Sequence, residues 1–380
     1  MGHRRACTVS GLLLLALGWC PFGENVFAGD KTRLMLVDSY HGEFLWSQYT
    51  NRGFCDGLLK FGYLDNEAQV MRCFQQGEAE SSTTIVKRIW MDTKRKSSKQ
   101  ELMVIAPQVT QAVKVFHPDL LFLGDDNAAN YIGTEFLDTK MPIVVWGINN
   151  NPVKYGLIDS SERPGHNVTA VVEVKYFQEG IELLKTLVPQ VKKFAILSDA
   201  TDTGRANAKA AELLAQQNAP SFTLVESVST NEFEVFKQRT LELQGQVDAF
   251  VVLPTTMKDP QGQFVSDQAI IQWYLTHVHK PEVASSRRGV TLGLLCAADP
   301  DGYRQGYEGA RIAHDILANG ANPATYPTVT PKRGPLMVNR QRAQMLGIVL
   351  PAEPGMVQEY IDQALALQDS EASPKPSWRR

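Results

Sequence analysis

The stretch FQEGIELLKTLVPQVKKFAILS, residues 177–198, contains the unit from which the fold can be argued. Its first apolar residues recur at spacings of four, three and four positions: Phe177, Ile181, Leu184 and Val188. This spacing places them on one face of a helix, which Pro189 ends. The apolar run at 193–198 follows and is typical of a buried strand. The stretch therefore predicts a helix that leads directly into a strand.

The same alternation extends along most of the chain. Strand-like runs occur at 33–38, 69–74, 119–124, 143–147, 193–198, 222–228, 248–253 and 291–296. Helical spacing recurs between them, for example at Phe54, Leu58 and Phe61 within 47–61. Alternating strands and helices predict an α/β fold in which helices cover both faces of parallel sheets.

The middle of the chain indicates two such units rather than one wide sheet. Residues 147–169, GINNNPVKYGLIDSSERPGHNVT, are rich in Asn, Gly and Pro and lack helical spacing. We interpret them as a connection between two α/β units. The last residues, 369–380, have the composition of a disordered tail.

The N-terminus is typical of a secretory signal peptide. Arg4 and Arg5 precede an apolar run at 11–19, and small residues around Ala28 suggest cleavage there. The run is shorter than the roughly 20 residues that span a bilayer. Residues 1–28 are therefore predicted to be a signal peptide, with the mature protein in the periplasm. A lipid anchor on Cys20 is the less favoured alternative, because bulky Trp19 precedes it.

Composition limits the function further. The formal net charge is −3, which disfavours nucleic acid as a partner, and the 43% apolar content is enough for a packed core. Cys55, Cys73 and Cys296 follow the predicted leader. Three thiols are not a disulfide framework, and at least one must be free. The sequence leaves open whether any two of them pair.

Polar residues collect where the predicted strands end. These loops are Asp38–His41, Gly124–Asn127, Gly147–Asn151, Ser198–Gly204 and Pro254–Thr256. Each could simply cap a helix. In parallel α/β sheets, however, ligands bind beyond the carboxyl ends of the strands, so five such loops favour a shared cleft. The first loop also carries Tyr40, Phe44 and Trp46, which capping does not explain.

Catalytic motifs are missing from the sequence. There is no phosphate loop, HExxH, CxxC, GxSxG or GxGxxG. His277 and His279 fit cations at a helix end better than a metal site, and Asp299–Gly302 fits a turn better than a calcium loop. We therefore expect no enzymatic activity, no cofactor and no metal.

Several motifs together resemble one family. PGHNVTAVV at 164–172 is followed by a helix and then by LVPQVKKFAILSD at 187–199. Later come Gly306–Ala310, Ile316–Gly320, Pro323 and Pro327, and finally Val338–Asn339, Ala343, Leu346–Ile348 and Pro351. This order resembles the substrate-binding proteins of ABC transporters of the tryptophan/tyrosine-binding type, over nearly all of residues 30–360.

The resemblance implies a type I periplasmic binding protein, in which two Rossmann-like lobes with parallel sheets close around a ligand at a hinge. It places lobe one at 29–148 plus 293–325 and lobe two at 149–292 plus 326–368. The Asn-Val-Thr turn at 167–169 would then begin lobe two.

The resemblance also implies the ligand-binding positions. They are Tyr40, His41, Trp46, Asp126, Asn127, Asn149, Asp199, Thr203, Thr255, Thr256 and Ser285. Two features depart from the family pattern: Ala170 replaces the usual glycine after Asn-Val-Thr, and the first loop is longer and more aromatic. The ligand class therefore does not follow from the resemblance.

The expected function is the capture of a small polar or aromatic molecule for an ABC permease. The alternatives are a ligand sensor that reports to a membrane sensor kinase and, less favoured, an exported α/β enzyme. Amino-acid, nucleoside-like, sugar-like and aromatic ligands all remain open.

Overall fold

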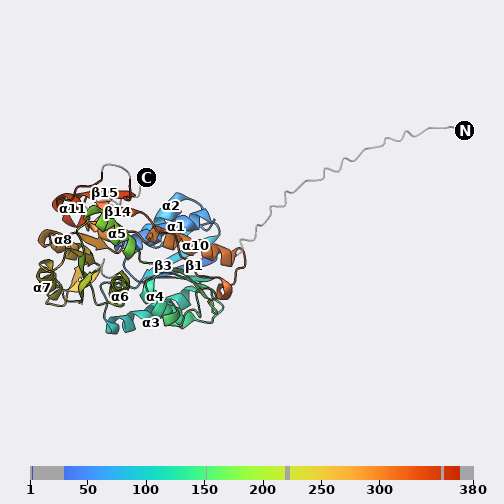
Figure 1. Cartoon of the computed structure of the whole chain (residues 1–380). Helices are drawn as coiled ribbons and strands as arrows, with labels where there is room; N and C mark the ends of the chain where they lie inside the picture. Colours follow the sequence, from blue (N-terminus) through green and yellow to red (C-terminus); the bar gives the residue numbers. More distant parts are fainter. Residues whose placement is uncertain (1, 3–29, 151, 219–222, 352–354, 369–380) are drawn as a thin grey trace.

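A computed structural model describes residues 2, 30–150, 152–218, 223–351 and 355–368. The predicted signal peptide with Cys20, and the predicted tail at 369–380, lie outside this description. The described chain forms two α/β lobes that lie side by side (Figure 1). The predicted fold class is confirmed.

The first sheet has six strands in the described residues, in the order β2-β3-β1-β4-β5-β6. Their bounds are Glu78–Glu80, Thr84–Trp90, Thr32–Asp38, Leu120–Gly124, Ile143–Ile148 and Val168–Val172. All neighbours pair in parallel except β2 and β3. The helices of this lobe are α1 (Leu45–Lys60), α2 (Glu67–Gln76), α3 (Lys99–Phe116), α4 (Asp125–Ile132) and α10 (Gly302–Leu317).

Strand β1 shows why this sheet is covered on both faces. Successive side chains point to opposite faces of a strand. Leu34 and Leu36 join the core under α1 and α10, whereas Met35 and Val37 join the core on the opposite face. All four are buried, so the strand is a continuous apolar run, as expected for a parallel sheet inside a protein.

The second sheet has seven strands in the described residues, in the order β15-β14-β13-β12-β9-β7-β8. Their bounds are Glu359–Ile361, Leu336–Asn339, Cys296–Ala298, Glu282–Ala284, Ala249–Val252, Lys193–Ser198 and Thr223–Ser229. Its helices are α5 (Phe177–Leu187), α6 (Asp202–Asn218), α7 (Phe233–Gln244), α8 (Asp267–His277), α9 (Arg287–Leu292) and α11 (Arg340–Met345). A hairpin of β10 (Thr256–Lys258) and β11 (Phe264–Ser266) lies beside it.

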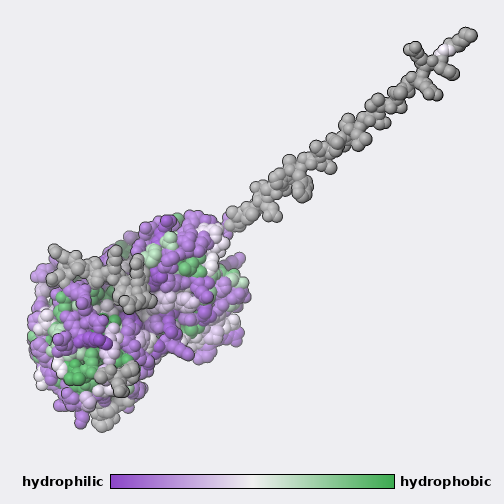
Figure 2. Space-filling view, turned by 90° about the horizontal axis from the view of Figure 1, so that it is seen from above, coloured by the Kyte–Doolittle hydropathy of each residue, from purple (hydrophilic) through white to green (hydrophobic). Residues whose placement is uncertain are grey.

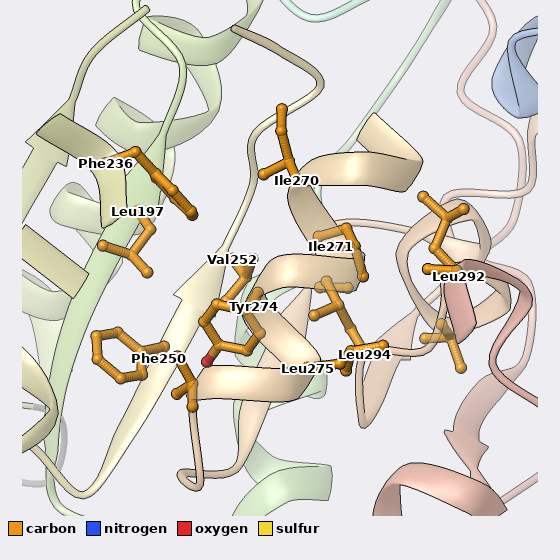
Figure 3. Close-up of a cluster of buried hydrophobic side chains, with 14 of the residues drawn as sticks. Leu197, Phe236, Phe250, Val252, Ile270, Ile271, Tyr274, Leu275, Leu292 and Leu294 are labelled. Atoms are coloured by element: carbon orange, nitrogen blue, oxygen red, sulfur yellow. The ribbon is translucent and has the colours of Figure 1, made fainter. Parts of the chain in front are cut away.

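The core of the second lobe follows the same rule. Phe194 and Ile196 pack toward α5 and α6, whereas Ala195 and Leu197 face the other side. Figure 3 shows part of this second cluster, in which Leu197, Phe250 and Val252 from the sheet lie opposite side chains of α7 and α8. The face of the molecule shown in Figure 2 is mostly hydrophilic, with patches of hydrophobic residues between the hydrophilic ones.

Two predicted strands are wrong. Residues 69–74 lie in α2, because the Asn66 side chain caps its N-terminus and Gly77 at φ 77° ends it. Residues 291–296 contain the end of α9 and only the first residue of β13. A six-residue segment rich in apolar residues fits a helix as well as a strand, so the residues that flank it decide, as Asn66 and Gly77 do for α2.

The crossings between the lobes also differ from the expected boundaries. Strand β6 pairs with β5, so 168–172 completes the first sheet instead of starting lobe two. The backbone of Val329 also hydrogen-bonds to Ala170 and Val172 of β6, so residue 329 still lies at the first sheet. Strand β13 was expected in lobe one but lies in the second sheet. Within the described residues the chain therefore crosses at 173–176, 299–301 and 330–335, later each time than expected.

Asn167 has a different role from the one expected at a lobe boundary. Its side-chain amide donates to the carbonyls of Phe136 (3.0 Å) and Met141 (2.6 Å), and its oxygen accepts from the backbone of Asp138 (2.7 Å). The side chain thus fixes the turn that leads into β5, inside lobe one.

Candidate functional site

The carboxyl ends of the strands in the two sheets face one another across the boundary between the lobes. Hydrogen bonds that cross it include the Tyr40 hydroxyl with that of Thr203 (3.5 Å), Lys94 Nζ to Thr255 Oγ1 (2.8 Å), and Thr256 Oγ1 to the Lys94 carbonyl (2.7 Å). The hydroxyls of Tyr49 in α1 and Thr291 in α9 also meet across it, at 3.3 Å. The lobes are therefore in direct contact around this region.

A cavity of about 250 Å³ opens between the lobes. Its lining includes Tyr40, Lys94, Asn127 and Tyr131 from lobe one, and Thr203 and Asn231 from lobe two. Hydroxyl, amide and ammonium groups from both lobes thus meet at one space large enough for a small solute.

The aromatic loop after β1 lies deeper between the lobes. Tyr40, Phe44 and Trp46 form a small buried cluster, and the Tyr40 and Phe44 rings meet edge to face at 5.1 Å. Cationic groups from other segments face these rings. Lys94 Nζ lies 4.3 Å from the Tyr40 ring centre, and the Arg288 guanidinium lies 5.5 Å from that of Phe44. The rings therefore form part of a charged site as well as an apolar wall.

Asp125 and Asp126 begin α4 side by side but have different surroundings. Both oxygens of Asp126 accept hydrogen bonds within lobe one, from Asn149, Asn150 and the Tyr155 hydroxyl. Asp126 thereby holds the loop after β5 against the start of α4.

Asp125 is left partly unsatisfied. One oxygen accepts from Trp46 Nε1 at 2.8 Å, and no group in the described ranges donates to its other oxygen. The residue is only 1% exposed and has a left-handed backbone, φ 68°, which is uncommon for a non-glycine residue.

Burial raises the pKa of Asp125 well above its usual range, and the nearby carboxylates of Asp38, Glu173 and Asp126 raise it further. Glu173, which follows β6 and pairs with Lys175, also has a raised pKa because it is buried. Acidic groups from two strand ends and one crossing therefore converge on Asp125. A cation placed beside them would be favoured.

Lys94 is the complementary feature. Its side chain is buried, and its ammonium donates to the neutral hydroxyl of Thr255. No carboxylate of the described chain lies within ion-pair distance of it, whereas Arg288 pairs with Asp267 at 2.8 Å. Burial lowers the pKa of Lys94, although the charge of Asp199 opposes that shift. A ligand anion would be favoured at this ammonium.

Comparison with known proteins identifies the family. The model of the family described as ABC transporter substrate binding protein matches residues 64–354. The chain belongs to this family.

A curated relative agrees with this assignment. The substrate-binding protein is 25% identical over 207 residues to a tyrosine-binding protein of Clostridioides difficile, a match covering 54% of this chain and 57% of that relative. The chain thus matches little more than half the length of that curated relative.

Solved structures show the same fold. One is described as the ABC domain in complex with L-Trp from Streptococcus pneumoniae, with TM-score 0.67, 20% identity, and coverage of 87% of this chain and 100% of that one. Another is the ligand-free, open structure of a substrate binding protein with adhesive properties from Clostridium difficile, with TM-score 0.60, 20% identity, and coverage of 87% and 99%. These likenesses establish the two-lobed periplasmic binding protein fold.

Five of the eleven positions expected to bind ligand in this substrate-binding protein line the cavity or bond across the boundary. Tyr40, Asn127 and Thr203 line the cavity, and Thr255 and Thr256 bond to Lys94. Their contact with ligand stays a prediction.

Other expected positions are engaged by the protein itself. Asp199 accepts from the backbone and hydroxyl of Thr255 (2.8 and 2.9 Å), and Asn149 donates to Asp126. His41 lies 3.3 Å from Asp92, and burial lowers its pKa. Ser285 is buried two residues before α9.

Sequence reasoning missed Asp125, Lys94 and Arg288. Lys94 is followed by Arg95 and Lys96, and such a basic run is typical of a solvent-exposed surface. Only the fold places the Lys94 side chain in the interior. For Asp125 a signal existed, since it directly follows a wholly buried strand. Neighbouring Asp126 carries the same chemistry, and the sequence cannot say which of the two is satisfied internally.

The described residues contain no group of three or more His, Cys, Asp or Glu side chains arranged to hold a metal ion. The His277 ring instead stacks on that of Trp273, with the ring centres 4.9 Å apart, and the Asp301 side chain caps the N-terminus of α10. Within the same residues, no helix has both the length and the apolar character needed to cross a membrane.

Proposed function

We propose that this protein is an exported binding protein that captures an α-amino acid with an apolar or aromatic side chain and delivers it to an ABC import permease. The observation that carries the ligand class is a pair of buried ionisable groups, neither of which is fully partnered within the described residues. Asp125 has a free carboxylate oxygen, and Lys94 has no carboxylate partner in the described chain. A zwitterion would satisfy both.

The proposed roles follow from the chemistry of each group. The ligand ammonium would replace the proton on Asp125, and its carboxylate would lie against Lys94 and the nearby hydroxyls of Thr255 and Thr203. Both contacts would be charge-assisted hydrogen bonds in a site shielded from water. The Tyr40, Phe44 and Trp46 rings would contact the side chain. The named ligands of the two relatives, tyrosine and L-Trp, belong to this class.

Export and delivery to a permease are supported by the family and by the leader-like N-terminus. Binding without chemistry is supported by the family, which comprises substrate-binding proteins and not enzymes.

The test is calorimetric titration of the mature protein with amino acids and two truncated analogues. L-Trp and L-Tyr are expected to bind, whereas tryptamine, which lacks the carboxylate, and indole-3-propionate, which lacks the ammonium, are expected to bind at least about 30-fold more weakly. Loss of one partner of a buried charge pair costs about 2–5 kcal/mol. Equal binding of either analogue would contradict zwitterion recognition.

Two variants localise the effect. Asp125→Asn and Lys94→Met should each weaken amino-acid binding by about 100-fold. The matched controls, Asp362→Asn and Lys96→Met, change exposed residues of the same types and should leave affinity unchanged. If Asp125→Asn and its control bound equally well, the ammonium site would lie elsewhere.

A further inference from the structure

Two of the three cysteines in the described chain lie against each other in lobe one. Cys55 is in α1, Cys73 is in α2, and their Sγ atoms are 3.1 Å apart. Both are buried, in the core cluster under α1 and α10. The third, Cys296, lies in the second sheet, where its Sγ approaches the carbonyls of Gly180 and Glu282.

This arrangement suits a covalent bond. A disulfide requires an Sγ–Sγ distance of about 2.05 Å, so the sulfurs need to approach by about 1 Å. The two residues are separated by 18 positions, and α1 and α2 pack together through the intervening turn. The packing of α1 on α2 therefore brings the two cysteines together even without a covalent bond.

We propose that Cys55 and Cys73 form a disulfide in the mature protein and that Cys296 remains a free thiol. The proposal rests on the export proposed above, because disulfides persist in oxidising compartments.

The reaction removes two protons and two electrons from the two thiols. One cysteine attacks the disulfide of a thiol–disulfide oxidoreductase or a small disulfide, forming a mixed disulfide, and the other then displaces the reduced carrier. Because both sulfurs are buried in the folded lobe, the first attack on the carrier takes place before α2 has packed on α1. The packing of the two helices then brings the second sulfur to the mixed disulfide.

The bond would join α2 to the helix that forms one wall of the site. The first turn of α1 carries Trp46, which bonds to Asp125, and the rest of α1 packs along α10. A cross-link here reduces the freedom of the unfolded lobe and leaves the cleft residues unchanged.

The test is refolding of the denatured mature chain with oxidised and reduced glutathione, followed by iodoacetamide under denaturing, non-reducing conditions. We expect one alkylated cysteine per chain before reduction and three after it. Trypsin should release GFCDGLLK (53–60) linked to CFQQGEAESSTTIVK (73–87). Three alkylated cysteines before reduction, or a link that includes Cys296, would overturn the proposal.

Stability supplies a second readout. Reductant should lower the melting temperature of the oxidised protein by about 5–10 °C. The double variant Cys55→Ala/Cys73→Ala should not respond to reductant, whereas Cys296→Ala should respond like the parent. Identical responses of the double variant and the parent would contradict the assignment, even if the ligand titrations succeed.

Discussion

Neighbouring residues of the same type have opposite roles in this site. Asp126 is saturated by hydrogen bonds from its own lobe, and Asp125 keeps one buried oxygen free beside Asp38 and Glu173. Asp125 bonds to Trp46, whereas Asp126 bonds to Asn149, Asn150 and Tyr155 in the loop after β5. One residue therefore builds the loop, and the other is available for a ligand.

The raised pKa of Asp125 leads to a prediction about pH. Burial raises the pKa of Asp125, so the folded, ligand-free protein should hold a proton on Asp125 more tightly than the unfolded chain does. The free energy of unfolding should therefore fall as pH rises from the ordinary aspartate pKa, about 4, through the raised pKa of Asp125.

Urea denaturation between pH 4.5 and 8 measures this effect. Asp125→Asn is a suitable variant because asparagine also tolerates the left-handed conformation. The variant should lose part of the pH dependence and be more stable than the parent at neutral pH. The affinity of the parent for an ammonium ligand should weaken as pH falls below the raised pKa. A variant with the parent's full pH dependence would refute the assignment.

At the scale of elements, the packing of α1 on α10 positions the aromatic loop. The two helices approach closely because glycines lie where they cross. A Cβ added at Gly306 would lie 1.9 Å from the Thr50 carbonyl oxygen, and one added at Gly53 would lie 1.8 Å from that of Tyr303. Both neighbours are backbone atoms, so only a shift of a whole helix could make room.

We expect Gly306→Ala to lower the free energy of unfolding by about 2–4 kcal/mol, since the overpacked helices must separate. Gly245→Ala is the control, because Gly245 has a negative φ and nothing within 4 Å of the added Cβ. It should be neutral or slightly stabilising. Chemical denaturation of both variants measures the difference, and equal stabilities would refute close helix contact as the cause.

At the scale of the whole molecule, we expect the three crossings to act as a hinge, and the bonds between the lobes to favour the arrangement in which the lobes touch. Lys94 is central to that contact, because it bonds to Thr255 through its ammonium and to Thr256 through its carbonyl. The group proposed to bind the ligand anion therefore also belongs to the lobe contact, which couples binding to closure.

Thr256→Val should remove one cross-lobe hydrogen bond and leave the shape of the side chain nearly unchanged. Its loss, worth about 1–1.5 kcal/mol, should reduce the closed population and weaken ligand binding about 5–10-fold. Small-angle scattering of the ligand-free variant should show a larger radius of gyration. Thr276→Val, whose hydroxyl bonds only within and beside α8, should change neither quantity. Similar effects of both variants would contradict the role of this contact.

Much of the fold was predictable from the sequence because local patterns carry it. The 177–198 unit, the apolar strands at 33–38 and 119–124 and the alternation of strands with helices all correspond to observed elements. These signals arise from residues that are neighbours along the chain, where strand and helix spacing directly reports which side chains are buried. The loops that collect at the cleft were predictable for the same reason.

Tertiary structure decided the rest. It placed β6 in the first sheet, turned Lys94 inward and brought Cys55 against Cys73. It also determined which of two adjacent aspartates kept a free oxygen. Each of these outcomes depends on partners far away in the chain, and burial and hydrogen bonding between distant segments leave no periodic trace in the sequence.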